Sequence, residues 1–481
     1  MSKEFGYAGP IRDTGIPNLF NVFDLDNTKK RATQYGWTEV TESVFASAEL
    51  GWRSMLYLTL TGRNDWASQL TDSPQTSYFY PSVGLSGVVS SMVNLPQWFN
   101  FLKVRGSFSS VGNPYPKFLT CPTYSYDANT QTWSSQTHYP IGKLYPERTD
   151  SWEAGFEAIL FNNFKLNGSF YWANTHNQTF DPRLPVSSGY DKLYVQTGYV
   201  RNYGFEALLG YSNTWGDFSW ASNFTFSTNR NKIVELVRNY VHPETGVIYN
   251  IDKLELNTSD GRGFGKAKFI LKEGGTLGDL YTHADLKRDV NGNVLIDNDG
   301  NVSTVDNAGD IKLGSVLPKA NLAWNNDFSY RGINLGFLIT ARLGGICYSA
   351  TQAYLDLYGV SEVSAAARDA GGVLVNDRSM VNPQQFYEVV ASQSGLPTYY
   401  TYSATNVRLQ EAHIGYTIPR RWLRGVCDIN VSVVGRNLWM IYCKAPFDPE
   451  AVATTNNYYQ GIDYFMMPST RNIGFNVKIN F

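Results

Sequence analysis

The chain contains 481 residues, with a formal net charge of −2 and 15% aromatic residues. The near-neutral charge gives no reason to expect nucleic acid as a partner, and abundant Tyr, Gly, Asn, Ser and Thr indicate an all-β protein with many turns. The four cysteines form no C-x-x-C pair, so they predict neither a zinc site nor a disulfide scaffold and leave one or two disulfides open: Cys121, Cys347, Cys427 and Cys443.

Segments that alternate between apolar and other residues recur along the whole chain. In "MLYLTLTG" (55–62) and "SWEAGFEAILF" (151–161) the apolar residues occupy alternate positions, and "NIGFNVKINF" (472–481) alternates without a break. A period of two is typical of β-strands with one apolar and one polar face. The pattern predicts about thirteen strands. They begin near residues 41, 53, 77, 99, 149, 163, 200, 217, 318, 332, 405, 425 and 472.

The connections between these strands differ in length in a regular way. Short connections, such as 162–164 and 330–332, alternate with long ones. The long ones span 113–147, 178–198, 230–316, 345–403 and 438–471. An antiparallel transmembrane β-barrel has short periplasmic turns and long extracellular loops, so this asymmetry predicts such a barrel. A soluble β-sandwich or propeller, the alternative, gives no reason to collect the long loops at one end.

Charged side chains on the polar faces of these strands fit a wet barrel lumen. They are Glu153, Glu157, Glu206, Lys165 and Lys478. Two acids on one face also suggest a glycosidase, but on a barrel strand we interpret Glu153 and Glu157 as lumen-facing residues and expect no enzyme. The apolar faces carry tryptophans near the ends of strands, as an aromatic girdle would: Trp152, Trp172, Trp220 and Trp324.

The composition and direction of the last strand indicate whether this chain can form a closed barrel. It includes Phe475 and Ile479 and ends on Phe481, and a hydrophobic last strand that ends in Phe resembles the outer-membrane insertion signal of bacterial barrels. If this strand runs inward, residues 1–36 form an extracellular loop segment and residues 37–481 form the barrel. An odd number of strands cannot close simply, and the N-terminus has no apolar signal-peptide region. We therefore expect the C-terminal part of a larger barrel.

Longer sequence motifs occur in a recognisable order along the chain. They include "SVFASAELGWRSMLYLTLTGRNDWASQL" (43–70), "LYPERTDSWEAGFEAILFNN" (144–163), "ATNVRLQEAHIGYTIP" (404–419), "GRNLWMIYCKAPFDPEA" (435–451) and "QGIDYFMMPSTRNIGFNVKINF" (460–481). Together they resemble the SusC/RagA-type TonB-dependent transporters, in family order, over nearly all of residues 37–481.

This resemblance implies a barrel of about 22 strands with an N-terminal plug. It implies import of oligomeric nutrients, either glycans or peptides, driven by the TonB system and assisted by a SusD-like surface lipoprotein. Because signal peptide, plug and early strands are missing, we expect a fragment of such a transporter, embedded in lipid of the outer membrane of a Gram-negative bacterium. The alternative is an independent porin-like or adhesin-like barrel of about fourteen strands, with one more strand from the N-terminal segment.

Loops are the expected place for ligand binding in such a protein. The segments "LPTYYTYSA" (396–404) and "NNYYQGIDYF" (456–465) are rich in Tyr. Aromatic rings with polar groups suit sugars or peptides, through stacking and hydrogen bonds. We expect Tyr458 and Tyr459 to line the external mouth and to contact the substrate.

Two further polar segments receive a structural interpretation. "DVNGNVLIDNDGN" (289–301) carries oxygen ligands at alternate positions, which calcium favours. Its Asn-Gly and Asp-Gly pairs, however, predict hairpin turns, so we expect hairpins there, with calcium as the alternative and no other cofactor. The segment "RNDW" (63–66) is predicted to end a strand at a turn.

Overall fold

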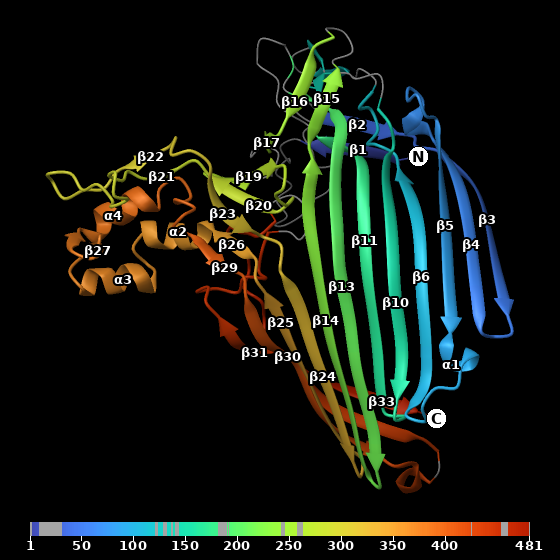
Figure 1. The fold of residues 1–481 in the computed structure, drawn as a ribbon. Coiled ribbons are helices and arrows are strands. Elements are labelled where there is room, and N and C mark those ends of the chain that lie inside the picture. Colours follow the sequence, from blue (N-terminus) through green and yellow to red (C-terminus); the bar gives the residue numbers. More distant parts are fainter. Residues whose placement is uncertain are drawn as a thin grey trace, which may run out of the picture.

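The computed structural model describes residues 2–8, 31–120, 124–127, 132–135, 138–139, 144–180, 190, 192–241, 246–256, 263–424, 426–453 and 460–480. Thirteen strands form one sheet of antiparallel pairs (Figure 1). They are β3 (Thr41–Trp52), β4 (Leu56–Ala67), β5 (Ser77–Val88), β6 (Phe99–Asn113), β10 (Glu147–Leu160), β11 (Phe164–Phe180), β13 (Val195–Trp215), β14 (Phe218–Glu235), β24 (Ala320–Tyr330), β25 (Ile333–Leu343), β30 (Asn406–Ile418), β31 (Asp428–Cys443) and β33 (Asn472–Asn480). Every predicted strand is present, which confirms the all-β fold class.

The connections alternate between the two ends of the sheet. The five longest, 114–146, 181–194, 236–319, 344–405 and 444–471, all lie at one end, which we call the loop end. The opposite turn end carries tight turns, one of them formed by Arg331 and Gly332 with φ of +47° and +89°. Two successive residues with positive φ match the twist of antiparallel strands, which favours Gly at the second position. The predicted asymmetry of connections is confirmed.

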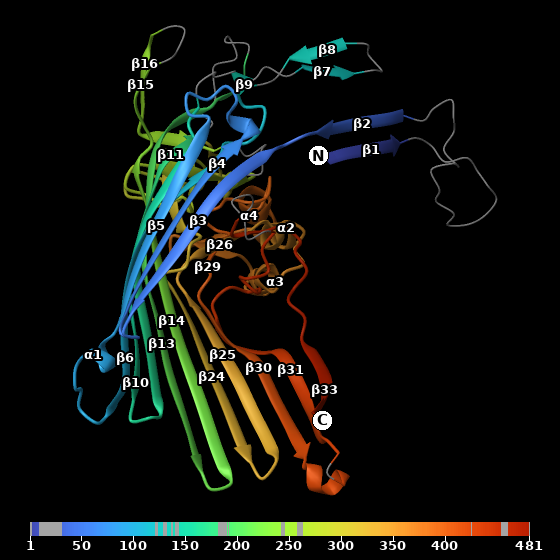
Figure 2. The same ribbon diagram turned by 90° about the vertical axis from the view of Figure 1, so that its right-hand side faces the viewer.

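The sheet curls so that one face is concave and the other convex (Figure 2). The strand registers place the five charged residues predicted for the lumen on one face. Glu153, for example, lies opposite Ser107 on β6 and Tyr171 on β11. The same face carries Glu157, Lys165, Glu206 and Lys478. Apolar residues occupy the alternate positions, on the convex face.

Aromatic residues on the convex face gather toward both ends of the strands. Toward the loop end, Trp152 and Trp172 lie opposite each other on β10 and β11. Trp324 lies opposite Phe224, six residues along β14 from the level of Trp152 and Trp172 and six from Phe218 at the turn end, so its prediction as a girdle residue is wrong. Its Nε1 donates a hydrogen bond to Ser222 Oγ over 3.0 Å. Near the turn end, rings pack in series with centroids 4.7 to 6.5 Å apart: Phe161, Phe164, Tyr211, Trp220 and Phe328.

Residues 63–66 are four of the last five residues of β4, which ends at Ala67, so the predicted end of a strand is confirmed, but these residues do not themselves form a turn. They lie within β4 and pair with β5. Arg63 Nε donates a hydrogen bond to Asp65 Oδ1 over 2.7 Å on the concave face. The predicted turn is therefore wrong, because cross-strand pairing stabilises polar residues that in isolation favour turns.

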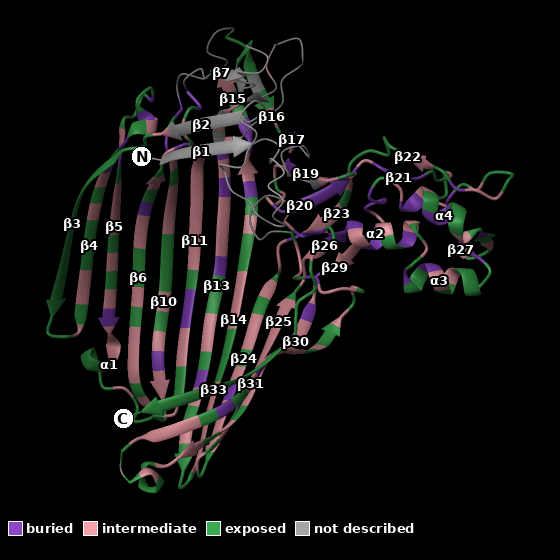
Figure 3. Cartoon of the chain, turned by 180° about the vertical axis from the view of Figure 1, so that it is seen from behind, coloured by how far each residue is buried: buried purple, intermediate pink, exposed green. Residues whose placement is uncertain are grey.

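Strands β3 and β33 form the two edges of the sheet, and Figure 3 shows both exposed along their length. Among the described residues each has one partner strand, β4 and β31, so the sheet is open between these edges. Phe475 and Ile479 are 81% and 48% exposed on β33. Phe481 lies outside the described residues, and the predicted insertion signal stays a prediction.

The N-terminal segment adds no strand to the large sheet. Strands β1 (Ser2–Ala8) and β2 (Arg31–Trp37) pair only with each other in the described part of the chain. They lie at the loop end (Figure 2). The fourteenth strand of the porin-like alternative is thus not found there, and the assignment of residues 1–36 to an extracellular loop stays a prediction.

The longest connections pack into a unit at the loop end, which we call the loop domain. It comprises the described residues of 246–319 and 344–405 together with 460–463, and its core contains Phe269, Tyr348 and Ile462. Its strands are β16 (Ile248–Ile251), β17 (Lys253–Glu255), β18 (Gly263–Phe264), β19 (Ala267–Lys272), β20 (Asp279–Thr282), β21 (Asp285–Leu286), β22 (Thr304–Val305), β23 (Ile311–Ser315), β26 (Ile346–Ser349), β27 (Val373–Val375), β28 (Ser379–Val381), β29 (Thr401–Ser403) and β32 (Ile462–Asp463). Other loop strands are β7 (Tyr124–Asp127), β8 (Thr132–Ser135), β9 (His138–Tyr139), β12 (Lys192–Leu193) and β15 (Val237–Val241).

Three helices in the loop domain were not predicted: α2 (Ala350–Leu357), α3 (Glu362–Asp369) and α4 (Pro383–Val390). Their first turns are capped by Ser349, Ser361 and Asn382, whose side chains accept backbone N–H bonds. Such caps are sequence signals, but helices this short depend on tertiary packing. Two shorter helical turns, α1 (Val89–Met92) and η5 (Arg420–Leu423), lie at the turn end, and η2 (Ser68–Leu70) follows β4. In the described part of the chain, no helix is both long and apolar enough to cross a membrane.

Candidate functional site

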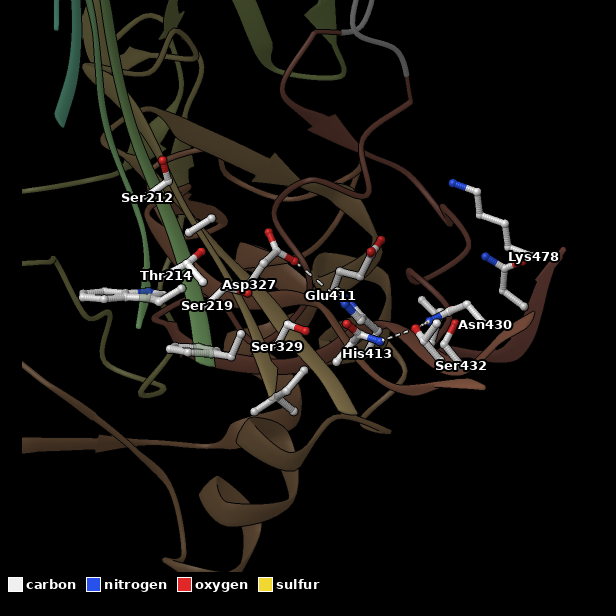
Figure 4. Close-up of a pocket in the computed structure, with 18 of the residues that line it drawn as sticks. Ser212, Thr214, Ser219, Asp327, Ser329, Glu411, His413, Asn430, Ser432 and Lys478 are labelled. Carbon is white, nitrogen blue, oxygen red and sulfur yellow. Dashed lines mark hydrogen bonds and ion pairs between the residues drawn. The ribbon is translucent and has the colours of Figure 1, made fainter. Parts of the chain in front are cut away.

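A hollow of about 980 Å³ lies against the concave face near the turn end, between β13 and β33 (Figure 4). Residues from seven neighbouring strands line it, and most of them are polar because every second side chain of each strand faces this side. Those labelled in Figure 4 include Ser212, Asp327, Glu411, His413 and Lys478. The strand order places Lys478 on an edge strand and Ser212 near the middle of the sheet.

Cross-strand ion pairs hold the charged groups of this hollow. Arg436 Nε donates to Glu411 Oε2 over 2.9 Å, and the two residues lie directly opposite each other on β31 and β30. His413 Nε2 lies 3.8 Å from Asp327 Oδ1. Sequence reasoning did not single out these four residues, although the alternating pattern would have placed them on the polar face.

The two predicted lumen acids are also in ion pairs. Lys165 Nζ lies 3.2 Å from Glu157 Oε1, and Arg105 Nη2 lies 3.4 Å from Glu153 Oε1. The concave wall thus presents fixed charges and hydrogen-bonding groups, which suit reversible binding of a polar solute.

A cluster of four aromatic side chains lies in the loops; we call it the aromatic loop cluster. It brings together Phe264, Tyr354, Tyr464 and Phe465 from three separate segments. The ring centroids of Phe264 and Tyr464 are 4.6 Å apart, and those of Tyr354 and Phe465 are 5.6 Å apart. Tyr464 and Phe465 are 39% and 57% exposed, so their rings are open to a ligand.

The predicted substrate residues Tyr458 and Tyr459 lie outside the described residues. They precede Tyr464 and Phe465 in the same Tyr-rich segment, so the cluster supports this segment as a ligand-binding candidate. The other Tyr-rich segment is structural in part. Tyr400 is 2% exposed and donates a hydrogen bond to Asp356 Oδ2 over 3.0 Å, and burial raises its pKa.

A buried arginine attaches the last long loop to the barrel. The Arg408 side chain on β30 is 4% exposed and donates to both carboxylate oxygens of Asp448, over 2.8 and 3.1 Å. It also lies 3.1 Å from Glu450. Burial alone would raise the pKa of Asp448, but the hydrogen bonds from Arg408 and Ser469 outweigh it and hold that pKa below its usual value. This attachment fixes the loop that carries Tyr464 and Phe465.

A second charged cluster stabilises the loop domain around Asp310. Its two carboxylate oxygens accept hydrogen bonds from Lys253 and Lys272 over 2.6 and 2.7 Å. His283 Nε2 lies 3.0 Å from the same carboxylate and 3.9 Å from Glu255. The hydrogen bonds from the two lysines hold the pKa of Asp310 far below its ordinary value.

The loop domain should therefore lose stability in acid. Because the pKa of Asp310 is lowered on folding, its contribution is complete above the ordinary carboxyl pKa of about 4 and disappears as the pH falls through the folded pKa. Asp310→Asn should cost the loop domain about 1–3 kcal/mol at neutral pH and flatten this acid dependence. Hydrogen exchange of residues 267–272, corrected for its intrinsic pH dependence, measures both effects. Equal exchange in the variant and the parent at neutral pH would contradict the prediction.

The segment 289–301 forms two successive hairpin turns, as predicted. Asp289 Oδ1 accepts backbone N–H bonds from Asn291 and Asn293, both over 2.8 Å. Asp297 Oδ1 repeats the arrangement with two later backbone N–H groups. Gly292 has a φ of +84°, which Gly adopts without strain. These turns explain the alternating Asp and Asn residues, and calcium binding stays a prediction.

Three cysteines lie in the described residues, and all three are free thiols. Cys347 is fully buried in the loop domain, and burial raises the pKa of its thiol to about 12. A thiol in this state is unreactive, since the thiolate is the nucleophile. Cys121 lies outside the described residues.

Comparison with known proteins identifies a matching family and several related sequences. Residues 3–254 match the family described as TonB dependent receptor-like, beta-barrel. TonB-dependent receptor P3 of Formosa agariphila is 25% identical over 91% of this chain and 45% of the relative. TonB-dependent receptor P26 of the same organism is 24% identical over 100% of this chain and 49% of the relative. The chain thus spans about half the length of the curated relatives it matches.

Solved structures give the same result for the fold. The structure of the RagAB peptide transporter matches with a TM-score of 0.71 at 18% identity, over 97% of this chain and 50% of that chain. The RagAB peptide importer in its open-open state matches with a TM-score of 0.66 at 18% identity, over 94% of this chain and 48% of that one. At this identity the likeness concerns the fold.

Proposed function

The chain belongs to the TonB-dependent receptor family, whose β-barrels lie in the outer membrane of Gram-negative bacteria, and from this premise we propose that it forms part of the wall of an importer of oligomeric nutrients. The family comprises receptors and transporters rather than enzymes, so the expected work is binding and passage without covalent chemistry. The thirteen-stranded sheet would supply more than half of the strands of a plugged barrel of about 22 strands.

The observation that carries this proposal is the polar concave wall with the aromatic loop cluster at its outer end. Peptides and glycans both present hydrogen-bonding groups along a chain, and the fixed side chains of the wall would exchange hydrogen bonds with them in turn. RagAB is a peptide importer, and this likeness in fold makes peptides the first substrate class to test, with glycans second. A SusD-like surface lipoprotein and TonB are the proposed partners.

Uptake measurements with loop variants test the proposal. In the outer-membrane transporter that carries this chain, a double change of Tyr464 and Phe465 to Ala should weaken binding of the imported oligomer roughly tenfold, because each lost aromatic contact costs about 0.5–1.5 kcal/mol. A double change of Tyr458 and Tyr459 to Ala should have a similar effect. Tyr358→Ala is the matched control, since this tyrosine is 73% exposed elsewhere in the loop domain.

The readout is uptake and surface binding of labelled peptide and glycan mixtures. Unchanged affinity and uptake in both double variants would exclude the proposed ligand-binding role of these loops. Conductance of the isolated chain without any energy source would favour the porin-like alternative. Uptake that is present with TonB and lost in its absence would support the importer.

A further inference from the structure

The convex face changes from apolar to polar and charged residues within two successive levels of side chains on four neighbouring strands. The registers align the residues of each level directly across β10, β11, β13 and β14. The first level contains Trp152, Trp172, Tyr203 and Arg230. The next level toward the loop end contains Asp150, Asn174, Arg201 and Lys232. Arg148 and His176 lie opposite each other one level further. We call the polar and charged residues of these levels the basic belt: Arg148, Asp150, Asn174, His176, Arg201, Arg230 and Lys232.

The spacing of the convex residues on β14 puts the basic belt at the height expected for the membrane surface. On β14 the convex residues run from Phe218 at the turn end to Phe226 and Thr228, and then to Arg230 and Lys232. The ten steps from Phe218 to Thr228 rise about 25 Å along the barrel axis, at about 3.4 Å per residue and a tilt of about 40°. A transmembrane barrel has an apolar band of about 25 Å. The belt therefore begins where the lipid head groups of the outer leaflet begin.

Most positive charges of the basic belt have no anionic partner. Arg148 pairs with Asp150 over 3.0 Å, and His176 lies 3.9 Å from the same carboxylate. Arg230 and Lys232 are exposed, and within the described residues neither side chain forms a hydrogen bond or ion pair with another residue. The acid of the belt is thus engaged by Arg148, while the cations on β13 and β14 are left without a carboxylate.

Arg201 is held in place by neutral groups. Its Nε donates to Asn174 Oδ1 over 3.1 Å, and its Nη2 donates to Tyr199 Oη over 2.7 Å. Its guanidinium also lies over the Trp172 ring, 4.6 Å from the centroid. This cation lies directly opposite Lys232, and like charges directly opposite each other on neighbouring strands destabilise a sheet. A bound anion between them would remove that cost.

We propose that the basic belt binds the phosphate groups of an anionic glycolipid in the outer leaflet, of the lipid A type. Arg201, Arg230 and Lys232 supply the positive charge, and the N–H groups of the Arg201 guanidinium that Asn174 and Tyr199 do not engage would donate to the phosphate. The aromatic level below, with Trp152 and Trp172, contacts the sugar and the start of the acyl chains. This inference depends on the outer-membrane location and is independent of the imported substrate.

Lipid-binding measurements on the outer-membrane transporter that carries this chain, in detergent micelles, test this inference. Native mass spectrometry would count bound diphosphoryl lipid A, fully dephosphorylated lipid A and inorganic phosphate. The double variant Arg230→Gln and Lys232→Gln should bind diphosphoryl lipid A about 10-fold to 30-fold more weakly than the parent. The matched control changes Arg421 and Arg424 to Gln, which removes two exposed cations at the turn end and should leave lipid binding unchanged.

Several results of these lipid-binding measurements would overturn the proposal. Equal binding in the double variant and the parent, or equal binding of phosphorylated and dephosphorylated lipid, would overturn the proposal. Displacement of the lipid by inorganic phosphate, with no competition from the dephosphorylated lipid, would identify a free-phosphate site and overturn it as well. If the double variant fails to fold, the parent alone supplies the test. Added salt should weaken binding of diphosphoryl lipid A and leave the dephosphorylated lipid unaffected, and an absence of salt dependence would refute it.

Discussion

Replacing Arg408 by Ala should release the last long loop from the barrel wall, with a local loss of about 3–5 kcal/mol. The reason is that the Asp448 carboxylate, 9% exposed beside a guanidinium that is 4% exposed, would lose its bidentate partner. A buried charge without a partner costs far more than the lost pair itself contributes. The amide of Ala453, which donates to the Ile462 carbonyl over 2.9 Å within this loop, reports the release by faster hydrogen exchange.

Arg436→Ala is the control for this prediction. Arg436 also forms an ion pair, with Glu411, but its side chain is 68% exposed. Exposed pairs contribute at most about 1 kcal/mol, so exchange at Ala453 should hardly change. Similar hydrogen exchange at Ala453 in both variants would show that the burial of Arg408 does not account for its effect on the loop. Release of the loop should also reduce ligand binding at the aromatic loop cluster, because Tyr464 and Phe465 lie in the same connection.

Replacing Gly204 by Val should prevent assembly of the large sheet. A Cβ atom at this position of β13 would overlap the backbone carbonyl oxygen of Thr228 and the hydroxyl of Tyr171. The Tyr171 side chain can rotate, but the carbonyl belongs to the neighbouring strand and can move only if the sheet distorts. Overpacking costs about 1–3 kcal/mol in well-packed cores and more when the backbone must shift. The yield of heat-modifiable folded protein and its melting temperature measure the effect.

Gly474→Val is the matched control in the same sheet. Nothing lies within 4 Å of a Cβ atom at Gly474 on β33, and Val has a high strand propensity. This variant should therefore fold like the parent, within about 0.5 kcal/mol. Normal folding of the Gly204→Val variant would mean that β13 and β14 can separate locally without loss of the sheet.

Much of the fold could be predicted from single residues and their spacing. The alternation in 151–161 fixes which side of β10 is polar, and the registers agree with it for Glu153 and Glu157. The family resemblance, drawn from motifs such as 404–419, agrees with the family match over residues 3–254. Both the alternation and the motifs are contained in short segments. The alternation is local because successive residues of a barrel strand face two different environments.

Several local predictions failed where a distant contact decides the outcome. Residues 63–66 look like a turn, yet pairing with β5 keeps them in a strand. Trp324 belongs to an alternating strand, but its height in the barrel depends on where the neighbouring strands begin. Tyr400 lies in a Tyr-rich segment that resembles a ligand-binding loop, whereas the core of the loop domain buries it.

The strands, their two faces and the family can be recognised from neighbouring residues, because the period of two and the motifs are local patterns. Which residues contact one another depends on the folded chain. Arg408 and Asp448 are joined by a loop, the aromatic loop cluster unites three segments, and the basic belt exists only because four registers align its charges. Registers and loop packing depend on contacts between segments far apart in the chain, and no pattern within one segment encodes them.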